Sequence, residues 1–204
     1  MNLANNHENS IQANGYSVYP HDIKTNFMSI IGHCQVKGNV TAKELINKGT
    51  TSANDCFVET VENIGNLSIN RLQGEKIVTS GHLKCKGNVS AELFQSKGAV
   101  NIQGSLHANT IYIKITSTSN VDIVTSKGDI TIKKSRTAFL NLLPTRLRTK
   151  RLKGEKIVIE HVEASEVVGD IIDVGPNCII EKLYYKTKCD IHSKAKVLSK
   201  HQIR

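Results

Sequence analysis

Large rings and prolines are scarce in this chain of 204 residues. It has no tryptophan, three prolines and an aromatic share of 4%. This composition favours a narrow core filled by valine, isoleucine, leucine and alanine over a core built around aromatic side chains. No run of about 18 apolar residues occurs, so the sequence predicts no membrane-spanning helix.

The motifs of several large enzyme classes are also missing. The sequence has no phosphate-binding loop, no dinucleotide-binding glycine fingerprint and no HExxH pair. Its five cysteines include no CxxC pair, which argues against a disulfide framework and against a zinc site. Cys34 and Cys85 alternate with valine or leucine and are expected to be small buried core residues. We expect no catalytic residue, no metal and no cofactor.

Two enzymatic alternatives remain open at this point. Carboxylates are scattered between residues 155 and 173, and a pectinase-like helix can gather such groups in an acidic cleft. Residues 175–180, GPNCII, resemble one hexapeptide of the left-handed acyltransferases. That family needs many consecutive copies, and this chain has essentially one.

What the sequence does contain is a repeat. Residues 32–49 (GHCQVKGNVTAKELINKG) and 81–98 (GHLKCKGNVSAELFQSKG) share nine of eighteen positions without a gap. A second pair joins RLQGEKIV at 71–78 to RLKGEKIV at 151–158. The glycines recur with a period close to seventeen residues, too short for a pair of helices. Such a period indicates a solenoid whose turns consist of short strands joined by tight bends.

Between the glycines, apolar residues alternate with polar ones, as strands require. Ile111, Ile113 and Ile115 show this alternation, as do Ile130 and Ile132. A β-sandwich is the main alternative, but it would show hairpin turns every 8–12 residues, and these are absent. The predicted fold is therefore all-β, a parallel β-helix of about seventeen residues per turn.

The repeat breaks at residues 133–153, where eight basic residues and no acidic one surround an apolar stretch ending at Pro144. Three interpretations are open: a cap over the solenoid, a wedge that lies on an anionic membrane surface, or a nucleic-acid contact. The lack of stacking aromatics argues against nucleic acid. The candidate membrane or partner contacts are Phe139, Leu140, Leu142, Leu143, Arg146, Arg148, Lys150 and Arg151.

These observations predict five regions. Residues 1–28 form a polar flexible tail, 29–132 the first β-helix turns, 133–153 a basic and apolar insertion or cap, 154–190 the final turns, and 191–204 a basic tail. The formal net charge of +9 favours anionic partners. The polar beginning of the chain lacks the features of a signal peptide, so we expect a cytoplasmic location.

The glycine-punctuated turns with KGNV resemble bactofilins, bacterial cytoskeletal proteins that form polymers. ITIKKS at 130–135, the basic stretch after it and GEKIV…EKLYY at 154–185 resemble the bactofilin-like paralogues of Bacillus-type bacteria. The resemblance extends from about residue 30 to about residue 197. Where those relatives have a valine-arginine-glycine turn and an IGPGC segment, this chain has Val168-Gly169 and VGPNC at 174–178.

The resemblance implies a right-handed β-helix that assembles end to end without nucleotide and without polarity. It implies scaffolding in cell shape, envelope synthesis or motility, at the inner face of the membrane, with itself or a paralogue as partner. It carries over no catalytic or cofactor residue. Stacked strands also end in two open edges, which favour pairing with a like molecule. The alternatives are a monomeric module that binds anionic lipid or DNA, and the acyltransferase.

Overall fold

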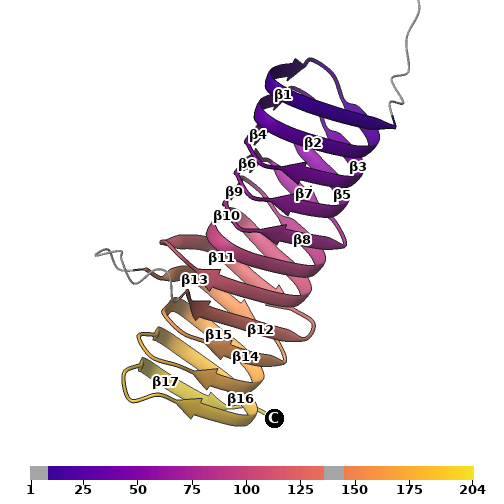
Figure 1. The fold of residues 1–204 in the computed structure, drawn as a ribbon. Coiled ribbons are helices and arrows are strands. Elements are labelled where there is room, and N and C mark those ends of the chain that lie inside the picture. The colour runs from indigo at the N-terminus through magenta and orange to yellow at the C-terminus, as the bar shows by residue number, and fades with distance from the viewer. Residues whose placement is uncertain (1–8, 136–144) are drawn as a thin grey trace, which may run out of the picture.

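The chain forms one long column of stacked strands (Figure 1). The computed structural model describes residues 9–135 and 145–204. Within these residues the fold is all β, a solenoid of about 11 turns with about 17 residues per turn. The predicted fold class and period are confirmed, whereas the handedness stays an expectation that rests on the resemblance.

Each turn consists of up to three strand segments, some of which run together around a corner. The strands are β1 Ser10–Tyr19, β2 Ile23–Val36, β3 Val40–Asn47, β4 Thr50–Ser52, β5 Asp55–Asn63, β6 Asn66–Ile69, β7 Arg71–Gln73, β8 Lys76–Thr79, β9 His82–Cys85, β10 Val89–Ile115, β11 Ser119–Ser126, β12 Asp129–Lys134, β13 Leu147–Lys153, β14 Lys156–Ile159, β15 Val162–Val174, β16 Ile179–Ile191 and β17 Lys196–Gln202.

Every strand pairs in parallel with the strand one turn away. The spacing between paired residues is 17 from β1 to β2 (Ser10 with Phe27) and 16 from β3 to β5 (Val40 with Cys56). It rises to 28 from β11 to β13 (Ser119 with Leu147), where residues 136–144 intervene. The column therefore continues on both sides of the insertion in the same parallel arrangement.

The core is a set of apolar columns that run along the solenoid axis. In one of them Met28, Leu45, Val61, Ile77 and Phe94 follow one another at successive turns, and each is at most 1% exposed. Full burial of such side chains contributes about 1.5–3 kcal/mol each. The period-two alternation of the sequence is thus the alternation between this core and solvent.

One corner of the turn explains the glycine period. Gly32, Gly49, Gly65, Gly81 and Gly98 occupy this corner in five consecutive turns. A Cβ on Gly49 would lie 2.0 Å from the carbonyl oxygen of Gly32, and a Cβ on Gly65 would lie 1.9 Å from that of Gly49. Any side chain here would collide with the backbone of the preceding turn, so the corner requires glycine at each level.

A buried row of polar side chains lies beside the glycine corner. Asn47 Nδ2 donates a hydrogen bond to Asn63 Oδ1 (2.8 Å), and Asn63 Nδ2 donates to Thr79 Oγ1 (2.9 Å). Ser96 occupies the same register position one turn further on, and its buried hydroxyl has no partner among the described residues. The hydrogen bonds between successive turns compensate for the burial of the Asn47 and Asn63 amides.

Both sequence repeats correspond to repeated places in the turn. The two eighteen-residue copies lie three turns apart, since Gly32, Gly49, Gly65 and Gly81 are successive corners. In the second pair, RLQ ends β7 and RLK ends β13, and after Gly-Glu in each copy KIV begins β8 and β14. The internal similarity therefore reflects equal positions in the solenoid.

The structure corrects the predicted boundaries at both termini. Residues 10–28 were expected to be a flexible tail, but they form β1 and the start of β2. Their composition is polar because only alternate residues, such as Ile11, Ala13 and Met28, face the core. The expected C-terminal tail likewise contains β17, which pairs with β16 as the last turn.

The predicted insertion is also shorter than residues 133–153. Lys133 and Lys134 end β12, and Leu147–Lys153 form β13, a regular strand of the column. Arg148 and Lys150 fit an exposed strand face because they alternate with the buried Leu147 and Thr149.

Candidate interaction surfaces

The eight residues proposed for membrane or partner contact divide into two groups. Arg146, Arg148, Lys150 and Arg151 lie in or directly before β13, on the outside of the column. Phe139, Leu140, Leu142 and Leu143 lie outside the described residues.

All four described cations have carboxylate partners on neighbouring turns. Arg146 Nη1 lies 3.0 Å from Glu163 Oε2, and Arg148 Nε lies 3.4 Å from the same oxygen. The other two pairs are Lys150 Nζ with Asp122 Oδ2 (2.6 Å) and Arg151 Nε with Glu166 Oε1 (2.7 Å). The basic strand is thus linked to β11 on one side and to β15 on the other.

Glu163 shows the electrostatic effect of this arrangement. The hydrogen bond from Arg146 has the largest effect and lowers the pKa of the Glu163 carboxyl. Burial opposes it, and the hydrogen bond from Arg148 lowers the pKa further. The Glu163 side chain is 44% exposed, and ion pairs at such surface positions contribute about 0–1 kcal/mol each. Much of the positive charge of β13 is therefore balanced within the column, which weakens the interpretation of this strand as a free anion-binding patch.

A groove of about 290 Å³ runs along the same face. Among the residues that line it are Asp122, Arg148, Lys150, Glu163 and Glu181. Four of these five belong to the ion pairs just described. The groove therefore presents alternating charges of both signs.

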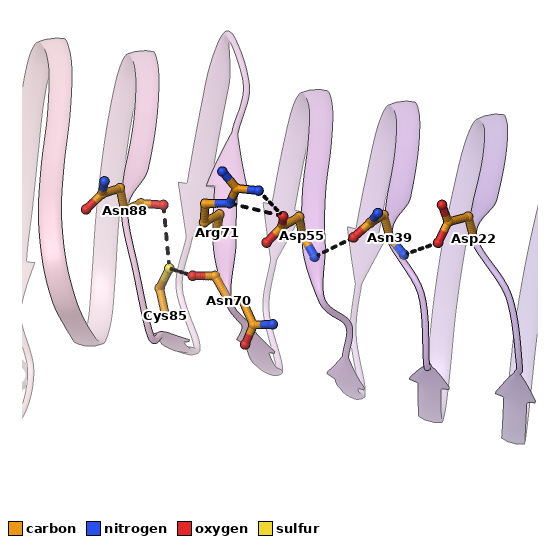
Figure 2. A network of polar contacts seen from close by, with 7 residues as sticks. All are labelled: Asp22, Asn39, Asp55, Asn70, Arg71, Cys85 and Asn88. Atoms are coloured by element: carbon orange, nitrogen blue, oxygen red, sulfur yellow. Dashed lines mark hydrogen bonds and ion pairs between the residues drawn. The ribbon is translucent and has the colours of Figure 1, made fainter.

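A second polar row follows an outer corner of the N-terminal half, and Figure 2 shows it from close by. The backbone N–H of Asn39 donates to Asp22 Oδ1 (2.8 Å), and that of Asp55 donates to Asn39 Oδ1 (3.2 Å). Arg71 Nε then donates to Asp55 Oδ2 (3.0 Å). Each side chain is used to join one turn to the next, which indicates a structural role for this row.

Four of the five cysteines are buried, and Cys189 is partly exposed. Cys34 and Cys85 are fully buried, as predicted, and the Cys85 thiol donates to the carbonyls of Asn70 (3.1 Å) and Asn88 (3.6 Å) (Figure 2). Burial raises the pKa of the Cys34 thiol to about 11. The buried thiols are therefore protonated core residues at neutral pH.

The two ends of the column differ in chemistry. At the N-terminal end, β1 (SIQANGYSVY) contains no charged residue and exposes 74% of Tyr16. At the C-terminal end, which we define as residues 186–204, six lysines and arginines accompany a single carboxylate, Asp190. The basic residues are Lys186, Lys188, Lys194, Lys196, Lys200 and Arg204.

Within residues 9–135 and 145–204, no group of three or more histidine, cysteine, aspartate or glutamate side chains is arranged to hold a metal ion. The same residues include no helix with the length and apolarity needed to cross a membrane.

Comparison with known proteins gives one partial similarity of note. The chain is 30% identical over 95 residues to the uncharacterized protein YhbF of Bacillus subtilis. This match covers 45% of the chain and 40% of YhbF, so the chain spans less than half the length of this relative. No family model matches the chain, and no solved structure matches it. The bactofilin resemblance therefore remains a resemblance, with which the solenoid fold is consistent.

Proposed function

We propose that this chain is a non-enzymatic structural protein that assembles end to end into bactofilin-like filaments or scaffolds without nucleotide. Its place would be the cytoplasm, at the inner face of the membrane, with itself and a bactofilin-like paralogue as partners. The observation that supports this proposal is the continuous parallel column with a strand edge at each end (Figure 1).

The physical argument concerns these end strands. The register gives β1 one partner strand among the described residues, β2, and gives β17 one partner, β16. A strand paired on one side presents backbone N–H and C=O groups on the other, which favours pairing with another strand. When each molecule has two such edges, contacts between copies extend into a filament.

The test is negative-stain electron microscopy together with sedimentation velocity of the purified full-length chain. Samples at low and at high salt, with and without added nucleotide, should contain particles larger than one chain, and nucleotide should make no difference. A strict monomer at tens of micromolar in every buffer would contradict the proposal.

A second function is favoured by the charge of the C-terminal end. The four cations Arg146, Arg148, Lys150 and Arg151 are paired with carboxylates, whereas residues 186–204 carry six basic residues against one acidic residue. Such a surface attracts anionic lipid. The chain should sediment together with anionic vesicles. The double variant Phe139→Ser/Leu142→Ser should sediment with them less if the apolar stretch contributes to binding. If the double variant and the unmodified chain sediment with the vesicles to the same extent, that stretch is removed from the proposal.

A further inference from the structure

The core columns end differently at the two ends of the solenoid. At the N-terminal end, Ile11 and Ala13 of β1 stand in register with Met28 and Ile30, so the column ends on apolar side chains. Ile11 is 9% exposed and Ala13 2% exposed. A further strand stacked on β1 would continue an apolar column.

At the C-terminal end one core column ends on Val197, in register with Ile180, but another ends on a lysine. Lys200 of β17 stands in register with the fully buried Leu183, which itself follows Val167. The Lys200 ammonium lies 5.5 Å from the centroid of the Tyr185 ring and is open to solvent. A strand stacked on β17 would bury this ammonium, and no carboxylate forms an ion pair with it among the described residues. Burial of an unpaired charge is costly, and inward-pointing charges on edge strands prevent edge-to-edge pairing.

The charges around the two edges also favour pairing at β1 over pairing at β17. β1 has no charged residue over its ten positions, and the next charges along the chain, Asp22 and Lys24, have opposite signs. The C-terminal end carries a net charge of +5, from six basic residues and Asp190. Asp190 itself is paired with Lys188 (2.8 Å). Two C-terminal ends brought together would therefore repel each other at low ionic strength.

We propose that copies of this chain associate first through the β1 edge, and that Lys200 with the cations around it blocks the β17 edge. This inference rests on the proposed end-to-end assembly and assigns its order. Of the three possible end contacts, only β1 against β1 avoids burying Lys200. That contact uses the same strand from both molecules, so it has two-fold symmetry and places the two β1 strands antiparallel.

The contact produces a closed dimer at low salt, because both remaining edges are β17. High salt screens the repulsion between the cations of two C-terminal ends, since the Debye length falls from about 10 Å at 0.1 M to about 3 Å at 1 M. Longer assemblies are therefore favoured at high salt. Replacing Lys200 by an apolar residue acts differently, because it removes the cost of burying the ammonium at the β17 edge.

Three variants of the full chain test the order of assembly by sedimentation velocity and electron microscopy at low salt. The unmodified chain should sediment with twice the mass of one chain. Ile11→Lys should reduce this mass to that of a monomer, because it places a lysine at the end of the β1 column. Gln12→Lys is the matched control: it adds the same charge on the exposed face of β1 and should leave the dimer intact.

Lys200→Leu should convert the dimer into filaments or large particles at low salt, and circular dichroism should report unchanged strand content for every variant. If the unmodified chain is a monomer at every salt concentration, both the proposed function and this inference fail. If it assembles but Ile11→Lys assembles equally well, or if it already forms filaments at low salt, only the order of assembly is overturned. A Lys200→Leu variant that stays dimeric would also overturn it.

Discussion

Replacing Asn63 by alanine should remove three hydrogen bonds from the interior of the column. Asn63 is 1% exposed and accepts from Asn47 Nδ2 at 2.8 Å. Its own amide donates to Thr79 Oγ1 at 2.9 Å and to the carbonyl oxygen of His82 at 3.2 Å. In the alanine variant the three partner groups would stay in place without a hydrogen bond to residue 63, and a small cavity would open beside the glycine corner.

The expected cost follows from the partners that remain. Asn47 Nδ2 keeps a second acceptor, the carbonyl oxygen of Asn66 at 3.0 Å, so its loss is partial. Thr79 Oγ1 and the His82 carbonyl lose the amide donor, and each group left without a partner costs about 1–3 kcal/mol. With a contribution from the cavity, the free energy of unfolding should fall by about 3–5 kcal/mol.

Urea unfolding followed by far-ultraviolet circular dichroism measures this change. The matched control is Asn54→Ala, which removes an exposed amide that donates to the carbonyl of Lys37 (2.8 Å), at a cost of about 1 kcal/mol or less. Thr79→Val should cost less in the Asn63→Ala background than in the unmodified chain, because its hydrogen-bond partner is already gone. Equal costs for Asn63→Ala and Asn54→Ala would refute the idea that the buried row stabilises the column.

Three further predictions concern the corner, the ion pairs and the thiols. Gly65→Ala should lower the unfolding midpoint in urea strongly, because its Cβ would lie 1.9 Å from a carbonyl oxygen, whereas Gly128→Ala (3.1 Å) should be mild; similar midpoints would contradict the collision. Glu163→Gln should cost about 1 kcal/mol or less at neutral pH. The pKa of Glu163 is lowered in the fold, so its contribution to stability is present above the ordinary pKa of a carboxyl group and is lost in acid. The difference in unfolding free energy between Glu163→Gln and the unmodified chain should therefore vanish in acid. When alkylation of the folded chain is followed by mass spectrometry, Cys189 should react first. Burial raises the pKa of Cys56 to about 12, so Cys56 should react only after unfolding. Equal rates of alkylation would exclude this order.

The fold was predictable because each turn faces the same geometric demand. At Gly49 and Gly65 the backbone of the preceding turn occupies the space of a Cβ, so glycine recurs once per turn and its spacing reveals the period. The alternation of Ile111, Ile113 and Ile115 follows from an interior on one side of the strand. Both signals depend on local spacing, which a sequence displays directly.

The termini were predicted less well because composition hides alternation in short strands. β1 reads as polar, since the outward Gln12 lies between the buried Ile11 and Ala13 and the outward Asn14 follows them. In β17 the inward positions are Val197, in register with Ile180, and Lys200, in register with Leu183, so the apolar alternation is interrupted there. An edge strand that must avoid association carries charge where a central strand carries leucine. The basic residues that suggested a tail are thus the residues that suit β17 to the end of the column.

The charge balance of β13 depends on register, which the sequence alone does not supply. Arg148 faces Glu163 because β13 and β15 are offset by 15 residues, whereas the offset from β11 to β13 is 28. A reader of the sequence sees a basic run without acidic neighbours, and its carboxylate partners lie one turn away on either side. Once these pairs are formed, the unbalanced positive charge of the described residues is concentrated at the C-terminal end. The search for an anionic partner therefore belongs at β17, the same edge at which Lys200 opposes pairing with another copy.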